Sequence, residues 1–499
     1  MDLYMEQART RPGPRPCAVL GRAGGGLRAA LLAPTFIGLA WLAGCGRASG
    51  EGGDPGAPPL GEAPLADTAP SVSLGPWVMA APMNVARAGH TATRLLDGKV
   101  LVAGGLSMQT WQRPDEALSS AVLYDPATDT WTAAASMGTG RVHHEATLLA
   151  SGDVFVRGGH SGLPPVAAAE LYRRSLDLWT AVPPEPTPRI ASRITPLAGG
   201  RVLVTGGVTE PPYSPLSSCA IYDPALDLWT AARSMSHTQG HHAAAPLPDG
   251  KVLAIGEGTT QPEIYDPATD TWTPGAPMPA AVWRPDAALL PGGEILVTGG
   301  LYDGSSVVAQ VYTPATGAWA DVPGRGWEPP MLVTDQRTVL LPHGHALVTG
   351  GMVVDSPACG TATCWETAPP VYTFFYRSTE AYDPAIHAWS PGPDMAVGRG
   401  AHTATLLLDG TVLVTGGYGW ADDALQFYAH DSVERLTVAV VAGAPGAPCG
   451  SSLDCGGRSC VDGVCCDRPC AGACEACSVT AGAAQDGVCS PLTGPACDD

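Results

Sequence analysis

Cationic and imidazole side chains recur at fixed positions along the middle of this 499-residue chain. Each His stands 14 residues before a Gly pair, and each Arg stands three residues before the His position. The set is Arg87, His90, Arg141, His144, Arg189, His242, Arg399 and His402. Guanidinium and imidazole groups gathered in one place can receive a carboxylate or sugar hydroxyls, so one interpretation is a ligand-binding ring. The alternative is structural, because side chains at equivalent positions of a repeat can bond the carbonyls of adjacent strand ends.

A second candidate site is the long segment from Met352 to Arg377, which is rich in aromatic residues. It contains Cys359 and Cys364, which we expect to form a disulfide within one loop. Its aromatic residues are Trp365, Tyr372, Phe374, Phe375 and Tyr376. Aromatic side chains on such a loop suit contact with a sugar or a peptide, but they can equally pack on the base of their own loop. We take this segment as the main candidate for a binding patch.

The elements that must position these residues are seven copies of one repeat. In each copy a turn ends in Gly, a short β-branched run follows, and a Gly pair begins six residues after the turn Gly. The turn glycines are Gly98, Gly152, Gly200, Gly250, Gly293, Gly344 and Gly410. In six copies a Tyr then precedes a Trp by seven residues, as in Tyr124 and Trp131. Each repeat is long enough for four strands and is therefore predicted to form a four-stranded antiparallel sheet.

The local signals within a repeat support this interpretation. Runs such as residues 100–102 are apolar and bounded by glycines, which predicts strands buried on both faces. The Asp97-Gly98 dipeptide predicts a tight hairpin with positive φ at both central positions. After the third strand, the Asp125-Pro126 dipeptide predicts a turn in which Asp bonds its own backbone.

Sheets of this size cannot shield both faces alone, so we expect an all-β, seven-bladed β-propeller over residues 76–441. Two segments are candidates for the outer strand of the last blade. Trp77 has the same spacing to the His motif after it as Trp389 has, which predicts that Trp77 lies on a fourth strand. The other three strands of that blade are then expected near residues 402–428. The alternative is that residues 432–440 supply the outer strand.

The Gly pair, the Tyr and the Trp at these spacings resemble kelch repeats, and the resemblance covers residues 76–440. Local departures are Glu257, which interrupts a Gly pair, Arg173, which replaces an Asp, and Phe427-Tyr428, which no Trp follows. The resemblance implies a binding module, since kelch propellers commonly serve this way. Some exported kelch-type propellers are radical-copper oxidases and others are sialic acid mutarotases, which implies an enzyme as an alternative. The adjacent Tyr-His dipeptide that supplies copper ligands in such oxidases is absent from this sequence.

The N-terminal residues differ in composition from the repeats. Residues 1–44 combine five arginines with an apolar run from Ala29 to Ala43, which is the layout of an export signal. The motif around Cys45 resembles a bacterial lipoprotein cleavage site, which implies lipidation of Cys45, with ordinary secretion as the alternative. Residues 45–75 are rich in Gly, Pro and Ala and predict a flexible tether. We therefore expect an exported protein at the outer membrane or cell surface.

The C-terminal segment, residues 442–499, holds ten of the 15 cysteines and almost no large apolar side chains. Such a segment needs crosslinks to hold a fold, so we expect a disulfide-rich module. The cysteines are Cys449, Cys455, Cys460, Cys465, Cys466, Cys470, Cys474, Cys477, Cys489 and Cys497. Zinc binding at Cys474 and Cys477 is the alternative, but no His follows His430 and the export signal indicates an oxidising destination. Cys219, on a predicted third strand, is expected to be a buried thiol.

The formal net charge of −20 argues against binding to nucleic acid or to an anionic surface through a basic face. We therefore expect a non-catalytic binding or scaffold protein that presents rim loops to a protein or glycan ligand, without a cofactor or metal. Contact with a membrane is expected through the lipid anchor only. The alternatives are a galactose-oxidase-like or other carbohydrate-active enzyme and a purely structural envelope protein or adhesin.

Overall fold

The computed structural model describes residues 72–107, 117–161, 165–209, 214–301, 309–322, 333–342, 344–354, 373–421 and 424–440, and four two-residue strands further on. The predicted export signal, Cys45 and residues 45–71 of the predicted tether lie outside the described residues. The described part is all β, with one short 3-10 helix, η1 (Ala198–Gly200). None of its helices is long and apolar enough to cross a membrane.

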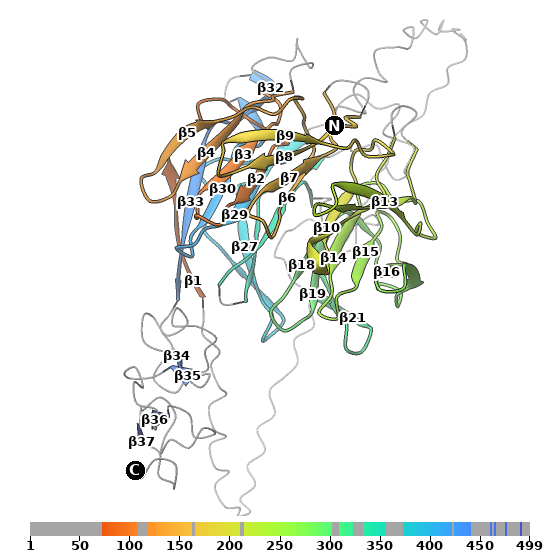
Figure 1. The fold of residues 1–499 in the computed structure, drawn as a ribbon. Coiled ribbons are helices and arrows are strands. Elements are labelled where there is room, and N and C mark those ends of the chain that lie inside the picture. Colours follow the sequence, from red (N-terminus) through yellow and green to blue (C-terminus); the bar gives the residue numbers. More distant parts are fainter. Residues whose placement is uncertain are drawn as a thin grey trace, which may run out of the picture. The chain divides into compact units, whose positions relative to one another are not determined.

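Seven four-stranded antiparallel sheets, here called blades A to G, form the body of the fold (Figure 1). Blade A contains β2 (Thr91–Arg94), β3 (Val100–Ala103), β4 (Ala121–Asp125) and β5 (Thr130–Ala134). Blade B contains β6 (Glu145–Leu148), β7 (Val154–Arg157), β8 (Ala169–Arg173) and β9 (Leu178–Val182). Blade C contains β10 (Arg193–Pro196), β11 (Val202–Thr205), β12 (Cys219–Asp223) and β13 (Leu228–Ala232). Blade D contains β14 (Ala243–Pro246), β15 (Val252–Ile255), β16 (Glu263–Asp266) and β17 (Thr271–Pro274).

The remaining blades follow the same order except for insertions. Blade E contains β18 (Val282–Leu289), β19 (Ile295–Leu301), β20 (Ala309–Thr313) and β21 (Ala318–Val322). Blade F contains β23 (Arg337–Leu340), β24 (Ala346–Thr349), β27 (Thr379–Asp383) and β28 (Ala388–Pro391). Blade G contains β29 (Thr403–Leu406), β30 (Val412–Thr415), β33 (Val433–Val440) and β1 (Val72–Ala80).

Smaller sheets add to this frame. A three-stranded sheet has the order β22 (Val333–Thr334), β25 (Met352–Val354) and β26 (Thr373–Phe375). A hairpin pairs β31 (Tyr418–Ala421) with β32 (Ala424–Ala429). Two short hairpins belong to the C-terminal segment: β34 (Cys460–Val461) with β35 (Val464–Cys465), and β36 (Glu475–Ala476) with β37 (Ser490–Pro491).

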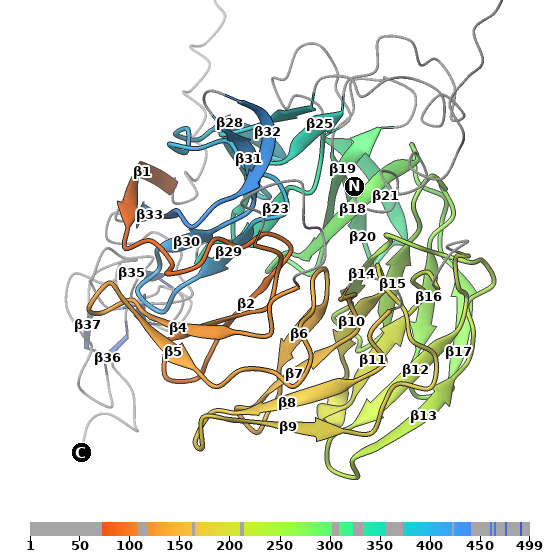
Figure 2. The ribbon, with the colours of Figure 1, turned by 90° about the horizontal axis from the view of Figure 1, so that it is seen from above.

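The first strands of the blades form a closed inner ring. Each of β2, β6, β10, β14, β18, β23 and β29 contacts the next, and β29 contacts β2 again (Figure 2). The second strands lie just outside and are buried at every position whose burial is described, as Val100, Val202 and Val412 show with 0% exposure. The predicted seven-bladed propeller is therefore confirmed.

The hairpin between first and second strands differs in one detail from the prediction. Leu95 N–H donates to Lys99 C=O at 2.8 Å, and Gly98 N–H donates to Leu95 C=O at 3.0 Å. Gly98 has a φ of 84°, whereas Asp97 does not have a positive φ. The connection is a three-residue loop with one left-handed Gly, so the expected positive φ at Asp97 was wrong. Asp97 instead accepts the N–H of Lys99 through its side chain, at 3.1 Å.

The predicted Tyr and Trp stand opposite each other on the third and fourth strands with tilted rings, and the Trp links neighbouring blades. Tyr124 is opposite Trp131, with ring centroids 4.9 Å apart. Trp131 Nε1 donates to the carbonyl of Ala81, in the connection that leads out of blade G, at 2.7 Å. The same bond to the preceding connection is made by Trp179, Trp229, Trp272 and Trp319. The Trp of the repeat therefore fastens the outer edge of one blade to the blade before it.

Both segments proposed for closing the ring take part in blade G. β1 is the outer strand, as predicted, and Trp77 Nε1 donates to Pro393 C=O at 3.0 Å. The third strand is β33, not the region of residues 427–428 that the repeat spacing indicated. Residues 427–428 belong to the inserted β31–β32 hairpin, which moves the third strand further along the chain. The chain is thus closed by pairing its first described strand with its last long one.

Candidate functional site

The four predicted arginines are buried and hold together strand ends of their own blades. Arg87 donates from Nη1 to the carbonyls of Gly104, at 2.8 Å, and of Ser120, at 2.9 Å. It is 0% exposed, so no ligand reaches it in this structure. The bond to the carbonyl of the first Gly of the pair is repeated by Arg141, Arg189 and Arg399. These bonds to strand-end carbonyls agree with the structural interpretation of the four arginines.

The four predicted histidines bind the neighbouring blade. His90 Nε2 is hydrogen-bonded to Thr415 Oγ1 at 2.8 Å, across the joint between blades G and A. His242 with Thr205 and His402 with Thr349 repeat this pair, whereas His144 binds Thr91, which lies on the first strand of blade A. Burial and nearby arginines lower the pKa of His90 to about 3, so the imidazole stays neutral. The expected carbonyl partner was wrong for these Nε2 atoms, because a threonine hydroxyl of the neighbouring blade stands there.

In four blades the first Gly of the pair makes room for this joint. A Cβ added at Gly416 would lie 2.2 Å from the carbonyl oxygen of Arg87 and 2.8 Å from Cε1 of His90. Gly104, Gly206 and Gly350 approach the next blade in the same way. The predicted Arg and His residues are therefore buried parts of the blade framework rather than an exposed ring.

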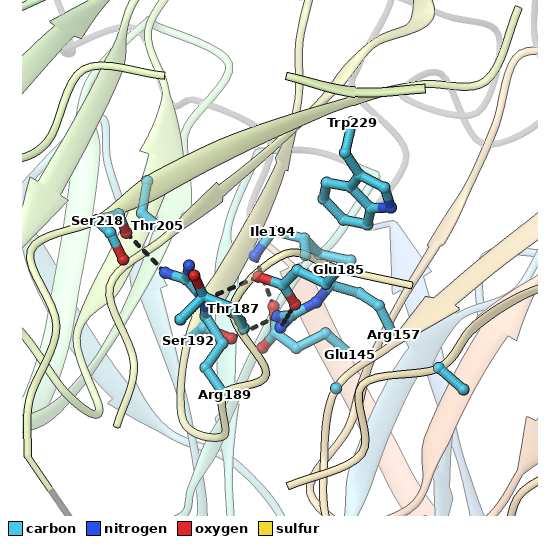
Figure 3. A network of polar contacts seen from close by, with 12 residues as sticks. Glu145, Arg157, Glu185, Thr187, Arg189, Ser192, Ile194, Thr205, Ser218 and Trp229 are labelled. Atoms are coloured by element: carbon cyan, nitrogen blue, oxygen red, sulfur yellow. Dashed lines mark hydrogen bonds and ion pairs between the residues drawn. The ribbon is translucent and has the colours of Figure 1, made fainter. Parts of the chain in front are cut away.

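The joint between blades B and C is built from charged residues (Figure 3). Between blades B and C, Ser192 stands at the His position and Arg157 at the Thr position, and Arg157 Nη1 donates to Ser192 Oγ. Arg157 Nη2 also pairs with Glu185, whose other oxygen pairs with Arg189 Nε at 2.8 Å. The three charged side chains are each 1% exposed. Since a buried charge needs a partner, Glu185 allows an arginine to replace the hydroxyl in this joint.

The predicted aromatic patch lies mostly outside the described residues. The residues outside are Cys359, Cys364, Trp365 and Tyr372. Only the backbone of Phe374 is described, as part of β26. Phe375 is half-buried and packs against a rim cluster that includes Ala88 and Val142, which belong to other blades. Tyr376 is half-buried as well, and burial raises the pKa of its phenol.

The cysteine predictions are tested at one position. Cys219 is a buried free thiol, as predicted, and burial raises its pKa to about 11. Cys460 and Cys465 stand opposite each other in the β34–β35 hairpin, but their side chains are outside the described residues. The other C-terminal cysteines also lie outside, so the disulfide-rich module remains a prediction: Cys449, Cys455, Cys466, Cys470, Cys474, Cys477, Cys489 and Cys497.

Seven residues with left-handed backbone lie at the Gly-pair end of the first strands, one immediately before each His position. They are Gly89, His143, Ala191, His241, Arg284, Asp335 and Ala401, with φ between 44° and 62°. Main-chain bonds join neighbouring members, such as His143 N–H to Gly89 C=O at 2.8 Å and Gly89 N–H to Ala401 C=O at 3.1 Å. We call these seven residues the axial ring. Sequence reasoning missed it, although four of its members stand next to the histidines that the repeat pattern singled out.

Polar side chains gather over blades D, E and F of the axial ring. Arg284 Nη1 and Asp335 Oδ2 form an ion pair at 2.9 Å, with 23% and 19% of these side chains exposed. His241 Nδ1 lies 3.7 Å from Glu257 Oε2, and Glu257 also accepts the main-chain N–H of Arg284. Glu257 occupies the second position of the interrupted Gly pair. These four residues, the axial cluster, are the candidate functional site.

The environment of the axial cluster shifts the titration of its members. Burial raises the pKa of Glu257 to about 7, although Arg284 opposes the shift. Burial lowers the pKa of His241 to about 3, and Arg284 adds to this effect. Burial acts to raise the pKa of Asp335, but Arg284 and Arg337 outweigh it and hold this pKa well below its usual range. Near neutral pH the cluster therefore combines a neutral imidazole, a partly protonated carboxyl and an ion pair.

The donor atoms of the described residues do not fit the copper site that the oxidase resemblance implies. In the described part of the chain, no three His, Cys, Asp or Glu side chains come together in a group that could hold a metal ion. The histidines of the repeat lie in separate blade joints, where each binds a threonine hydroxyl.

Comparisons with known proteins agree with the fold. Residues 87–138 match the Kelch motif family. Over 88 residues the chain is 35% identical to the Kelch-like protein terF of Aspergillus terreus, a match that spans 17% of this chain and 18% of that protein. A solved structure of a fungal alcohol oxidase of the AA5 family, in complex with copper, aligns with a TM-score of 0.55 at 19% identity. That alignment covers 74% of this chain and 76% of the oxidase, and at this identity it shows a shared fold alone.

The motif match falls on blade A and on the joint that follows it, and the same Gly, Arg, His, Tyr and Trp contacts recur around the ring. Seven such units close on themselves through β1 and β33. The protein is a seven-bladed kelch-repeat β-propeller.

Proposed function

We propose that this propeller is a non-catalytic binding or scaffold protein that presents its rim to a protein or glycan ligand. The observation that carries the proposal is a pair of insertions in adjacent blades. The β25–β26 hairpin and the β31–β32 hairpin follow the second strands of blades F and G, and β26 contacts β31 (Figure 2). Unequal loops on a frame of equal blades are the means by which a rigid fold varies its binding surface.

The burial of the repeated Arg and His residues also supports this proposal. The Arg and His residues of the repeat are engaged in packing, so the frame itself offers no exposed reactive group at those positions. On this rim, the inserted loops and the axial cluster differ between blades. Such a division between a constant frame and variable rim segments is typical of binding modules.

Anchoring at the outer membrane or cell surface is part of the proposal and depends on the sequence motif at Cys45. Contact with the membrane is then through the lipid only, and secretion is the alternative. Metabolic labelling with a radioactive fatty acid is expected to label the full chain expressed in a Gram-negative bacterium, and Cys45→Ser is expected to abolish labelling. Labelling that persists in Cys45→Ser would contradict the anchor.

The binding function is tested with arrays of immobilised glycans and peptides. Replacing residues 355–372 by a Gly-Ser linker is expected to abolish binding, because it removes most of the insertion in blade F. The matched control replaces residues 108–116, in the corresponding loop of blade A, and is expected to bind as the unmodified protein does. Absence of binding on both arrays would contradict the proposed function.

The oxidase alternative is separated by a chemical test. Purified protein is incubated with copper under oxygen and analysed by peptide mass spectrometry for a thioether link between Cys and Tyr. The binding proposal expects no such link, and its appearance together with oxidation of a sugar alcohol would replace the proposal by an enzymatic function.

A further inference from the structure

The axial cluster consists of departures from the repeat that the fold does not require. Ala191 and Ala401 hold the same left-handed position in other blades as Arg284 and Asp335 do here. Likewise, a Gly stands in other blades where Glu257 stands in blade D. A left-handed backbone costs a residue with a Cβ about 1–2 kcal/mol, and alanine already accepts this conformation at Ala191 and Ala401. The chain therefore places charged residues at positions where small ones satisfy the fold.

We infer that the axial cluster is a binding site for a neutral, hydroxyl-rich group such as one sugar unit of a glycan. This inference rests on the proposed binding function and commits it to one class of ligand. The site combines His241, Glu257, Arg284 and Asp335 at the Gly-pair end of the inner strands, on the same rim as the inserted hairpins.

The charge balance of the cluster disfavours ions of either sign. Asp335 already neutralises Arg284, so an anionic ligand has to compete with a carboxylate that lies 2.9 Å from the guanidinium. A cation that approaches Asp335 is repelled by the positive charge of Arg284. The charge of Arg337 also reaches Asp335, since it contributes to lowering the pKa of that carboxyl. Hydroxyl groups both donate and accept hydrogen bonds and carry no charge, so they can bind carboxylate, imidazole and guanidinium without disrupting the ion pair.

An indole lies close to the backbone next to Glu257. Trp283 precedes Arg284 in β18 and is half-buried, and a Cβ added at Gly258 would come within 3.9 Å of its Cζ3. Gly258 directly follows Glu257, so the indole and the carboxyl flank the same stretch of backbone. A flat apolar surface next to a few placed hydrogen-bonding groups is the composition expected of a site for a ring with hydroxyl substituents.

The cluster also joins two blades, since Arg284 belongs to blade E and Asp335 precedes blade F. A purely structural role for this ion pair predicts a loss of stability on substitution but no change in ligand binding per folded molecule. Binding and stability are therefore measured on the same variants.

The test uses the full chain on an array of neutral oligosaccharides, acidic oligosaccharides and peptides, followed by isothermal titration with the neutral oligosaccharide that gives the strongest signal. The double variant Arg284→Ala and Asp335→Ala removes both charges together and copies the residue found at Ala191 and Ala401. Glu257→Gly restores the regular Gly pair. We expect each to raise the Kd at least tenfold while thermal unfolding remains cooperative. Lys251→Ala, in a hairpin at the opposite end of the strands, is the control and is expected to leave the Kd unchanged.

The outcomes separate the inference from the function on which it rests. Binding to a neutral oligosaccharide that both axial variants leave unchanged overturns the inference and leaves the binding function in place. Binding to peptides or acidic glycans alone does the same. Absence of binding to every class on the array overturns both. Loss of stability without a change in Kd assigns the ion pair to the blade joint.

Discussion

His90 and Thr415 form a hydrogen bond of 2.8 Å although 325 positions separate them in the chain. They meet because the first and last blades are neighbours in the ring, and His242 with Thr205 and His402 with Thr349 repeat the pair at two other joints. The imidazoles are buried and neutral, so adding a second proton to one of these rings is expected to weaken its joint. This dependence makes the stability of the ring sensitive to pH.

We predict that acid destabilises the propeller below pH 6.5. The pKa of His90 and His242 is lowered by burial from 6.5 to about 3, so the unfolded chain takes up protons that the folded chain does not. Stability is therefore full above pH 6.5 and falls as the pH drops towards 3. The expected slope is about 1.4 kcal/mol per pH unit for each such histidine in that window.

Urea denaturation between pH 4 and 8 measures this slope. Substituting His90→Gln removes one of the titrating groups and is expected to make the pH dependence shallower at the cost of some stability at pH 8. A slope that is unchanged in His90→Gln would show that this imidazole does not titrate as its burial requires.

Glu185→Gln is predicted to destabilise the protein by about 3–5 kcal/mol, because it leaves Arg157 and Arg189 buried without a counter-charge. Glu145→Gln is the comparison, since Glu145 pairs with Arg193 where the side chains are 18% and 35% exposed and are partly screened by solvent. Equal losses in the two variants, measured by urea denaturation, would contradict the special role of Glu185.

The same joint can be converted to the pattern of its neighbours. Arg157→Thr combined with Ser192→His recreates the pair formed by Thr205 and His242. We expect each single change to be destabilising and the double variant to be more stable than their sum by about 1 kcal/mol or more. Strict additivity would show that the two positions are not coupled.

Gly416→Ala is predicted to destabilise the ring more than Gly250→Ala does. Both glycines have positive φ, 56° and 85°, so both substitutions strain the backbone by about 1 kcal/mol. Only at Gly416 would the new Cβ meet a carbonyl, 2.2 Å away, whereas nothing lies within 4 Å at Gly250. The difference between the two thermal midpoints therefore isolates close packing at the blade joint.

Trp77→Phe is predicted to destabilise the propeller by about 1 kcal/mol, since it removes the hydrogen bond from Nε1 to Pro393 while keeping an aromatic ring. Val78→Ala, at a neighbouring position that is 55% exposed, serves as the control and is expected to have a smaller effect. Equal effects in the two variants would mean that the bond contributes nothing to closure.

The repeat spacing was enough to predict the frame. Apolar runs such as residues 100–102 form the buried second strands, Tyr124 faces Trp131, and Trp77 closes the ring because these positions are set by the period of the repeat. The third strand of blade G was misplaced, because an inserted hairpin changes chain length without changing the frame. A period predicts what every blade shares and not what one blade adds.

Contacts between blades were harder to predict. The Thr partner of His90 could not be identified, because spacing within one repeat does not say which side chains of the next blade face it. The pairing of Arg157 with Glu185 could not be predicted for the same reason, because these two residues also meet across a joint between blades. The axial cluster was missed because Arg284 and Asp335 look like irregular residues in a loop until the ring brings them within 2.9 Å.

The pairing of β1 with β33 sets the order in which the molecule can be completed during synthesis. β1 leaves the ribosome before any blade exists, and its partner is not made until Val433–Val440 has been translated. Blades A to F can form as the chain lengthens, whereas the seventh needs a long-range contact that is slow to find. A chain that is truncated before β33 therefore cannot complete blade G, and its first strand, β1, is left without a pairing partner.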